Sequence, residues 1–533
     1  MNTQNKRIPG FLACLPLFFV LFVSCSSIPS QVQFPASNAS PDAKNSNPSS
    51  VPCKKDGMSE GEESNAIVVT IDPSCQIGES HFTTGITQTD NSLLSSWGSN
   101  DLEAVNQAKA LAKGNIAFQN THIMGWGLPD PWPNPSDPEP TNWSLLDQRL
   151  QTMVETGSTP VLTLCEAPWW MKGRNVGRKP AQTLTAADEW STIAYESRIL
   201  DNKMGSWLHL VQRVAERYMV PPYNVRYFQV WNEMKGYYDP AINNFDYTTS
   251  SGNPNGSYAN HGYTYMYNQV YNTLLQVAKA HGIDPKTINI GGPYIFMDTW
   301  STPKHASDPS RFSKVYGTID QRSLDVIQYW LQHKDGAGFI TIDGSVENRD
   351  TGLLATDPFT AGGVFADLVT WIRSLDPTLY PGSTTLPIWM AEWFAAPRQY
   401  LSGGPADAAF DNAVKASTTM KFIKAGGSVA LSWGASGDGS TDLGLWTSPS
   451  YPGGGQAHPW FYTLKSLKND FGSGEKLYSA DITGSSGVEA LATQSHVMLV
   501  NKSTTTLVVW INGSIKVSLA PHEVKVVSYE GKE

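Results

Sequence analysis

The sequence has few charged residues and no concentration of positive charge. Charged residues make up 16% of the chain, and 38 Lys and Arg against 48 Asp and Glu give a net charge of −10. The basic residues form neither a stripe nor a tail, and proteins that bind nucleic acid need such positive charge to contact the phosphates. We therefore expect no nucleic-acid partner.

Cysteine and histidine are also scarce. The five cysteines are Cys14, Cys25, Cys53, Cys75 and Cys165, and neither a CxxC nor an HxxxH spacing occurs. Structural zinc sites usually show such spacings, so we expect no metal and no other cofactor. Cys53 and Cys75 are predicted to pair as a disulfide in an oxidising compartment. Cys165 ends an apolar segment and is predicted to be a buried, inert thiol.

No apolar segment is long enough to be a comfortable membrane span. The most apolar one, Ile8–Val23, follows a basic start and ends at small residues, which is typical of a secretory signal. Leu21-Phe22-Val23-Ser24-Cys25 resembles a bacterial lipobox, which would place a lipid on Cys25; ordinary cleavage is the alternative. Residues 1–25 are thus predicted to be a signal peptide. The protein is expected to be exported and held at the cell surface or membrane by that lipid, or otherwise secreted.

Residues 26–65 are rich in Ser, Pro, Asn and Lys and lack apolar periodicity. Such a composition buries too little surface to fold, and it predicts a flexible tether. The remaining chain is long enough for one large barrel with a smaller domain. A hydrophobic fraction of 40% supports a large core, and 18 Trp and 21 Tyr suit a protein that stacks against sugar rings.

Short apolar segments recur eight times, each followed by a loop and a helical stretch. They are His81–Ile86, Thr121–Trp126, Pro160–Cys165, Arg226–Trp231, Ile288–Gly292, Phe339–Asp343, Pro387–Ala391 and Val429–Trp433. Helical periodicity is present between them, for example in Asp101–Lys113, Met204–Tyr218, Tyr263–His281 and Phe410–Ala425. This α/β alternation predicts a (β/α)8 TIM barrel over residues 66–472. A doubly wound sheet is the alternative, but its phosphate-binding glycine fingerprint is missing after the first strand.

The pattern changes after about Gly472. Apolar and polar residues alternate in His496–Asn501, Thr506–Asn512, Ile515–Leu519 and Val524–Tyr529, and Asn512-Gly513 is a hairpin turn signal. Residues 473–533 are therefore predicted to form a C-terminal β-sandwich. If a strand from the N-terminal extension, near Ala66–Ile71, completes this sandwich, the two domains are rigidly joined.

Two of the apolar strands end on a glutamate. The fourth ends Trp231-Asn232-Glu233 and the seventh ends Ala391-Glu392-Trp393. In such barrels the active site lies at the C-terminal ends of the strands. A Glu there has no packing use, although either one alone would also suit an ion pair at the rim. Two carboxyl groups across a barrel mouth are what glycoside hydrolysis needs, one to donate a proton and one to attack the sugar.

These motifs resemble the retaining glycoside hydrolases of clan A, whose two catalytic glutamates lie on strands four and seven. The most similar family is glycoside hydrolase family 39, the β-xylosidases and α-L-iduronidases, whose barrel carries a β-sandwich. The resemblance covers about Thr83 to Tyr529. It implies double-displacement hydrolysis of O-glycosidic bonds in plant or microbial polysaccharides or oligosaccharides.

The resemblance also implies roles for individual residues. Glu233 would be the acid/base and Glu392 the nucleophile. Asn232 would bind the 2-hydroxyl of the sugar, and His122 would help to hold the terminal sugar. The sequence departs from the pattern on strand two, where Asn120-Thr121-His122 replaces an expected Arg, and on strand six, which ends at Asp343.

Further residues at predicted strand ends are expected to contact substrate. They are Trp126, Trp170, Trp393 and Trp433, which offer stacking surfaces, and Glu166, a third carboxylate at the rim. Each Trp alone would also suit the core, and Glu166 would also suit an ion pair. Trp433 is the strongest of them, since relatives keep a Trp at the end of strand eight.

Two other functions fit the same sequence. One is an endo-acting glycanase of the same clan. The other is a non-catalytic surface lipoprotein that binds carbohydrate, although a binding protein has no reason to keep both glutamates. A carbohydrate is the expected partner in every case, the membrane is contacted only through the lipid, and the sequence leaves the oligomeric state and the sugar open.

Overall fold

The computed structural model describes residues 66–87, 91–95, 101–176, 179–249, 262–297, 308–316, 319–348, 352–353, 355–395, 405–437 and 444–529. The predicted signal peptide and tether, with Cys25 and Cys53, lie outside these residues. Cys75 is disulfide-bonded, and Cys165 is a free, buried cysteine. Within the described segments, no helix is long and apolar enough to cross a membrane.

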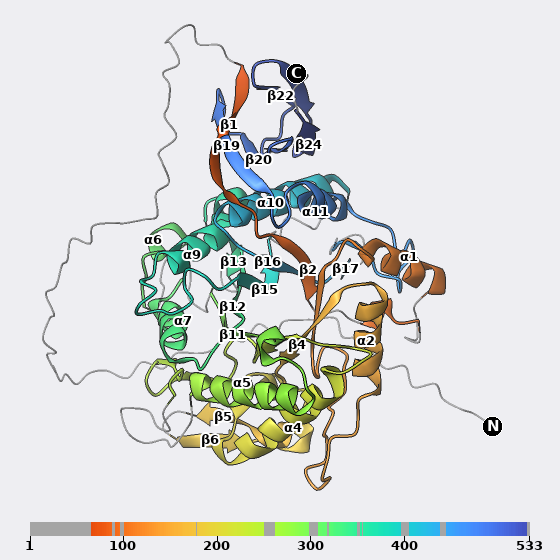
Figure 1. Cartoon of the computed structure of the whole chain (residues 1–533), viewed down its shortest axis with the longest axis vertical. Helices are drawn as coiled ribbons and strands as arrows, with labels where there is room; N and C mark the ends of the chain where they lie inside the picture. The colour runs from red at the N-terminus through yellow and green to blue at the C-terminus, as the bar shows by residue number, and fades with distance from the viewer. Residues whose placement is uncertain are drawn as a thin grey trace, which may run out of the picture. The chain divides into compact units, whose positions relative to one another are not determined.

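Eight parallel strands close into a barrel (Figure 1). In order around the barrel they are β2 (Thr83–Thr87), β3 (Phe118–His122), β4 (Thr159–Leu164), β8 (Tyr227–Val230), β11 (Asn289–Phe296), β12 (Phe339–Ser345), β15 (Ile388–Phe394) and β16 (Val429–Trp433). A long helix follows each strand: α1 (Leu102–Ala112), α2 (Ser144–Glu155), α4 (Met204–Tyr218), α5 (Tyr263–Ala280), α7 (Gln321–His333), α9 (Gly363–Arg373), α10 (Pro405–Lys424) and α11 (Pro459–Asp470). The predicted TIM barrel is confirmed.

The helices form because their apolar residues recur at helical spacing. In α4 the residues Trp207, Leu210, Val211, Val214 and Tyr218 are buried, which places them on one stripe facing the strands. Helix α1 begins at Asp101, whose carboxylate accepts a hydrogen bond from the Ala104 N–H at 2.9 Å and so caps the first turn.

The second barrel strand was predicted too far along the chain. It spans Phe118–His122 and not Thr121–Trp126. Ile123 and Met124 extend the apolar stretch, but they are buried in the loop that follows the strand. Trp126 therefore also lies in this loop, and its side chain is 48% exposed.

The loops above the barrel carry short elements of their own. Three of them pair in a small sheet: β5 (Lys172–Val176), β6 (Lys179–Thr183) and β7 (Arg198–Ile199). The two-residue strands are β9 (Tyr238–Asp239), β10 (Asn244–Phe245), β13 (Glu347–Asn348), β14 (Gly352–Leu353), β17 (Ser436–Gly437) and β18 (Trp446–Thr447). The short helices are α3 (Thr192–Tyr195), α6 (Ser313–Tyr316) and α8 (Pro358–Ala361), together with 3-10 turns at 91–93, 169–171, 186–188, 201–203 and 285–287.

The C-terminal strands form a β domain. Its seven strands are hydrogen-bonded in the order β23-β22-β1-β19-β20-β21-β24. The strands are β1 (Ile67–Glu79), β19 (Lys476–Thr483), β20 (Val488–Ala492), β21 (His496–Asn501), β22 (Leu507–Ile511), β23 (Ile515–Leu519) and β24 (Val524–Ser528). The N-terminal strand β1 makes the sheet continuous, because it pairs antiparallel with β19 and parallel with β22.

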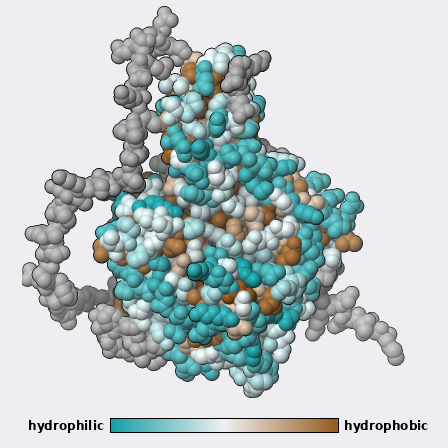
Figure 2. Space-filling model, viewed as in Figure 1, coloured by the Kyte–Doolittle hydropathy of each residue, from teal (hydrophilic) through white to brown (hydrophobic). Residues whose placement is uncertain are grey.

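The two faces of this sheet bury different neighbours. Val69, Val497 and Val509 belong to the sheet's own core, whereas Met498 and Val500 join the core around the barrel helices. On that second face, Lys424 of α10 donates to the Ala490 carbonyl of β20 at 2.6 Å. In Figure 2, polar residues cover most of the visible surface and hydrophobic residues are scattered among them in small groups.

Candidate active site

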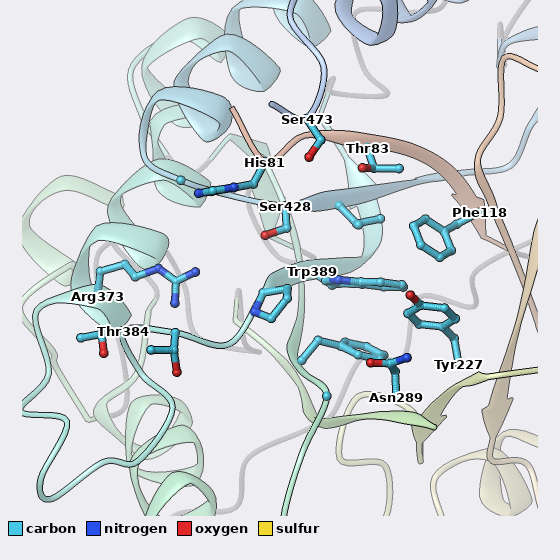
Figure 3. Close-up of a pocket in the computed structure, with 16 residues that line it drawn as sticks. His81, Thr83, Phe118, Tyr227, Asn289, Arg373, Thr384, Trp389, Ser428 and Ser473 are labelled. Carbon is cyan, nitrogen blue, oxygen red and sulfur yellow. The ribbon is translucent and has the colours of Figure 1, made fainter. Parts of the chain in front are cut away.

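The barrel interior is filled in layers. At the N-terminal end of the strands, the rings of Phe118, Tyr227, Phe339 and Trp389 pack together, with Phe339 and Trp389 stacked at 4.1 Å between centroids. A pocket of about 410 Å³ opens at this end. Figure 3 shows Trp389 near its middle, Phe118 and Tyr227 on one side and Arg373 on the other. Because catalysis in such barrels takes place at the opposite end, this pocket lies outside the candidate site.

A polar layer spans the middle of the barrel. Thr341 Oγ1 donates to Gln229 Oε1 at 2.7 Å, and Gln229 Nε2 donates to Thr163 Oγ1 at 3.1 Å. Thr163 Oγ1 donates to Asn120 Oδ1 at 2.8 Å, and Asn120 Nδ2 donates to Thr87 Oγ1 at 2.7 Å. These five strands are thus tied across the core by groups that satisfy one another, as buried polar side chains require. The layer forms the floor of the site above it.

Glu233 follows β8 in a strained turn. Trp231, Glu233 and Met234 have φ values of 69°, 45° and 55°, in the left-handed region that residues other than glycine seldom adopt. The turn is held by the Trp231 indole, whose Nε1 donates to the Lys235 carbonyl at 2.8 Å. Backbone strain of this kind is concentrated at functional sites, and here it turns the Glu233 side chain toward the barrel mouth.

Lys235 and Tyr195 contact the Glu233 carboxylate. Lys235 Nζ lies 2.7 Å from Glu233 Oε2, with both side chains largely buried. The Tyr195 hydroxyl lies 3.3 Å from the same oxygen, and Lys235 sits 4.9 Å from the centre of the Tyr195 ring. Lys235 and Tyr195 thus hold the Glu233 carboxylate in position from one side.

Glu392 faces the interior because β15 contains a β-bulge. Met390 and Trp393 pair with Ile342 and Gly344 of β12, so β15 has one more residue than its partner between these pairs. The same extra residue appears against β16. Strict alternation from the inward Trp389 would direct Trp393 inward and Glu392 outward. The bulge reverses the two positions, and Glu392 is only 5% exposed within the barrel.

Tyr294 contacts Glu392 from a second bulge. In β11, Pro293 and Ile295 pair with the adjacent residues Thr341 and Ile342, so Tyr294 is the unpaired extra residue, with φ of 52°. Its hydroxyl donates to Glu392 Oε1 at 2.9 Å. Nothing in the sequence alone marked Tyr294, because the bulge that aims it depends on pairing between strands.

Three carboxylates meet at the barrel mouth. Glu233, Asp343 and Glu392 each offer an oxygen within 4.8 Å of the other two. Burial, and then the charge of Glu233, raise the pKa of Glu392 well above its usual range, while the Tyr294 hydrogen bond and Lys235 act in the opposite direction. The predicted pair of glutamates is therefore brought together, and Asp343 of strand six lies beside it.

Glu166 and Asn232 lie next to this group. Burial raises the pKa of Glu166 to about 7, although Lys172, Lys235 and a hydrogen bond from Asn232 favour its charged form. Asn232 Nδ2 also donates to the Tyr195 hydroxyl at 3.2 Å. Asn232 Oδ1 is buried and has no hydrogen-bond partner among the described residues, so it is available to a ligand.

His122 is fully buried at the end of β3. Burial lowers its pKa to about 3, so the imidazole is neutral at physiological pH. One of its ring nitrogens, the Cys165 sulfur and a Glu166 oxygen all lie within 4.8 Å of one another. His122 has no exposed surface in this structure, and its role in holding the terminal sugar stays a prediction.

The four predicted tryptophans have different positions. Trp126 is exposed, and its ring meets that of Trp433 edge to face at 5.0 Å. Trp170 is buried, with its Nε1 donating to the Trp132 carbonyl at 2.9 Å. Trp393 is 3% exposed and packs against Phe365 on the helical side of β15. Of these four, Trp126 and Trp433 offer ring surface to a ligand.

A buried arginine supports the site from α2. Arg149 donates from Nη1 to Thr121 Oγ1 at 3.0 Å and from Nη2 to the Trp126 carbonyl. Its Nε donates to Asn91 Oδ1 at 2.9 Å. The arginine expected on strand two is absent, and an arginine from the following helix holds that strand and the Trp126 loop instead.

No family model matches the chain, and no curated protein matches its sequence. Solved structures do resemble it. A conserved exported protein from Bacteroides fragilis has a TM-score of 0.56 at 11% identity, with 87% of this chain and 100% of that chain covered. SrfJ from Salmonella typhimurium has a TM-score of 0.53 at 10% identity, with 90% and 94% covered. The endo-beta1,6-glucanase BT3312 has a TM-score of 0.50 at 10% identity, with 86% and 93% covered. At these identities the similarity shows that the chain shares their fold.

Proposed function

We propose that this protein is a retaining glycoside hydrolase of clan A. One observation carries the proposal: oxygens of Glu233 and Glu392 lie within 4.8 Å of each other at the C-terminal ends of β8 and β15. Retaining enzymes hold their two carboxyl groups about 5–5.5 Å apart, whereas inverting enzymes leave a gap of about 6.5–9.5 Å for water. The short separation supports double displacement. A glucanase among the proteins of similar fold is consistent with this chemistry.

In the proposed mechanism Glu392 attacks the anomeric carbon and forms a glycosyl-enzyme. Glu233 gives its proton to the departing oxygen and then takes one from the water that releases the sugar. Tyr294 stabilises the ionised Glu392 before attack. Lys235 stabilises the ionised Glu233 that serves as the base in the second step. Asn232 Oδ1 would accept a hydrogen bond from a sugar hydroxyl.

The rim supports a polysaccharide or oligosaccharide as the substrate. Trp126 and Trp433 form an edge-to-face pair at the mouth, and aromatic faces of this kind stack on the flat faces of sugar rings. Endo action on a polysaccharide is the second form of the proposal, because the 48% exposed Trp126 lies in a loop beyond the strand end and could hold a sugar outside the reacting one.

The test is hydrolysis of aryl glycosides and of plant and microbial polysaccharides by the wild type, Glu233→Ala and Glu392→Ala. We expect one class of glycoside to be cleaved with retained anomeric configuration, seen by NMR. Glu392→Ala should abolish cleavage, and azide should restore it with an inverted glycosyl azide as product. Full activity in Glu392→Ala, or an inverted product from the wild type, would contradict the mechanism.

We also propose that the protein is exported and that Cys25 carries a lipid. The signal-like N-terminus supports this, as do the disulfide-bonded Cys75 and a similar structure that is an exported protein. Fatty-acid labelling of the wild type and of Cys25→Ser tests the anchor. Labelling that persists in Cys25→Ser would show that the lipid is elsewhere.

A further inference from the structure

A second group of chemically distinct side chains lies directly beneath the candidate active site. His122 is the last residue of β3, and Cys165 and Glu166 follow the last residue of the neighbouring strand β4. His122 pairs with Thr163 in the parallel ladder. Because side chains alternate along a strand, Cys165 points to the same side as Thr163 and His122. Glu166 has φ of 55°, and this turn brings its side chain back toward the other two.

The result is a nitrogen, a sulfur and an oxygen ligand in one place. A ring nitrogen of His122, Sγ of Cys165 and a carboxylate oxygen of Glu166 lie within 4.8 Å of one another. Zinc binds this combination in proteins, with Zn–S of about 2.3 Å and Zn–N of about 2.0 Å, which places tetrahedral ligands roughly 3.5 Å apart. Side-chain rotations that move each of the three atoms by about 1 Å would bring them to that spacing.

We propose that His122, Cys165 and Glu166 form a binding site for a thiophilic divalent cation, Zn²⁺ in particular, and that the bound cation inhibits the active site. Binding forms one N–Zn, one S–Zn and one O–Zn bond, and the Cys165 thiol releases its proton to solvent. The fourth position would hold a water molecule. Two negative ligands then balance the two positive charges of the ion.

The electrostatic surroundings favour a cation. Three carboxylates, Glu166, Glu392 and Glu233, lie near Cys165 against one nearby cation, Lys172, and each carboxylate attracts a divalent ion. The ion would reach the site from the side of Glu166, because Glu166 is partly exposed whereas His122 and Cys165 are buried. The neighbouring group of Glu233, Asp343 and Glu392 contains only carboxylates and belongs to the proposed catalytic machinery, so it is not proposed as a metal site.

Inhibition follows from the contacts of Glu166. Its carboxylate accepts a hydrogen bond from Asn232, the proposed sugar-binding amide. Coordination would turn the carboxylate toward the metal and away from Asn232. The binding itself does not depend on the proposed catalytic function; only the inhibition does.

The first test titrates the full chain, with its Cys75 disulfide intact, against Cd²⁺, followed by thiolate charge-transfer absorbance, and against Zn²⁺, followed by calorimetry. We expect a single tight site whose absorbance band disappears in Cys165→Ser. Because other cysteines are unchanged in this variant, the difference between the two titrations belongs to Cys165. His122→Gln and Glu166→Gln should each lower the affinity for Zn²⁺ by more than about 100-fold. Even residues that only orient a metal ligand change metal affinity by about 10- to 100-fold.

His209→Gln is the matched control. His209 also lies beside a carboxylate, with its Nε2 2.9 Å from Glu139 Oε2, but it has no thiol neighbour, so its loss should leave the tight site intact. Near-ultraviolet circular dichroism of each variant verifies the fold, and Cys165→Ala serves if Cys165→Ser is misfolded. A cadmium band unchanged in both Cys165 variants, or no band in the wild type, would overturn the proposal whether or not the protein hydrolyses glycosides.

Once a substrate is found, the inhibition is tested separately. Zn²⁺ should lower kcat of the wild type, EDTA should restore it, and Cys165→Ser should need at least about 100-fold more Zn²⁺ for the same loss. Tight binding without any loss of kcat would refute the inhibitory role and leave the metal site standing.

Discussion

The Tyr294 hydroxyl donates a hydrogen bond to Glu392 Oε1 at 2.9 Å, and both residues lie at β-bulges in strands β11 and β15. In a regular barrel neither side chain would have this orientation, because alternation would direct Glu392 toward the helices. The two bulges together turn a carboxylate and its donor toward the same point. Glu392 is thereby held in one position, as an attacking group must be.

Tyr294→Phe removes this hydrogen bond while keeping the ring. The bond favours the ionised form of Glu392, so its loss should raise the pKa of Glu392 further. A nucleophile must be ionised, and activity therefore rises with pH through its pKa. We expect the acidic limb of kcat/KM to move to higher pH by about 1–2 units, since a hydrogen bond to a charged group contributes about 1.5–3 kcal/mol and one pH unit corresponds to about 1.4 kcal/mol.

A pH–rate profile of the wild type and Tyr294→Phe measures this shift. Tyr316→Phe is a suitable control, because Tyr316 also donates to a carboxylate, Asp367, at 2.7 Å but lies on the helical layer. An unmoved acidic limb in Tyr294→Phe would mean that Glu392 is not the group whose ionisation limits the rate.

Glu166→Gln should move the same limb in the opposite direction. The charge of Glu166 raises the pKa of Glu392, so an uncharged Gln lets Glu392 ionise at lower pH. Glu166 itself has a pKa of about 7 and is ionised mainly above that value. The gain should therefore be largest above about pH 7 and fade below it. Glu139 is a carboxylate that pairs with Arg213 on the protein surface. The pH–rate profile of Glu139→Gln should match that of the wild type. A shift of equal size in Glu139→Gln would rule out a local effect of Glu166.

The polar layer below the site should contribute to stability. Gln229 links Thr163 and Thr341, and Gln229→Leu leaves these buried hydroxyls without that partner. We expect a loss of about 1–3 kcal/mol in the free energy of unfolding for each group left unsatisfied. Urea denaturation monitored by Trp fluorescence measures it. Gln212→Leu, on the outer surface of α4, should cost far less, and a similar cost in both variants would argue against a special role of the layer.

Much of the fold could be predicted because strands and helices differ in the spacing of their apolar residues and in their length. Met204–Tyr218 was predicted with the observed bounds, since its apolar residues follow a helical stripe. His496–Asn501 and Ile515–Leu519 were also predicted as observed, because alternation and the Asn512-Gly513 turn fix their register. Asn512 and Gly513 both have positive φ, 48° and 68°, and the turn between the paired residues Ile511 and Ile515 has three residues.

The site was predictable only in part. Glu233 and Glu392 could be identified because a carboxylate at the end of an apolar strand is unusual. The contribution of Tyr294 and the outward position of Trp393 could not, since each depends on a single extra residue in a strand. Such bulges leave no periodic signal in the sequence. The closeness of His122 and Cys165 was hidden as well, because neighbouring strands bring together residues that are far apart along the chain.

Loss of an exposed tryptophan should change substrate binding, whereas loss of a buried one should change stability. Trp126 is 48% exposed and meets Trp433 at the rim, whereas Trp393 is 3% exposed and packs against Phe365 and Phe422. Trp126→Ala removes a stacking surface, so we expect KM to rise roughly 2- to 10-fold, corresponding to about 0.5–1.5 kcal/mol for an aromatic contact. The free energy of unfolding of this variant should change little.

Trp393→Ala leaves a cavity in the core and should lower the free energy of unfolding by about 3–5 kcal/mol. Kinetics with a soluble substrate and urea denaturation of both variants give the two quantities side by side. If Trp126→Ala leaves KM unchanged for every substrate that the wild type cleaves, the rim pair does not bind sugar, and the substrate is held only by the polar groups around Glu233 and Glu392.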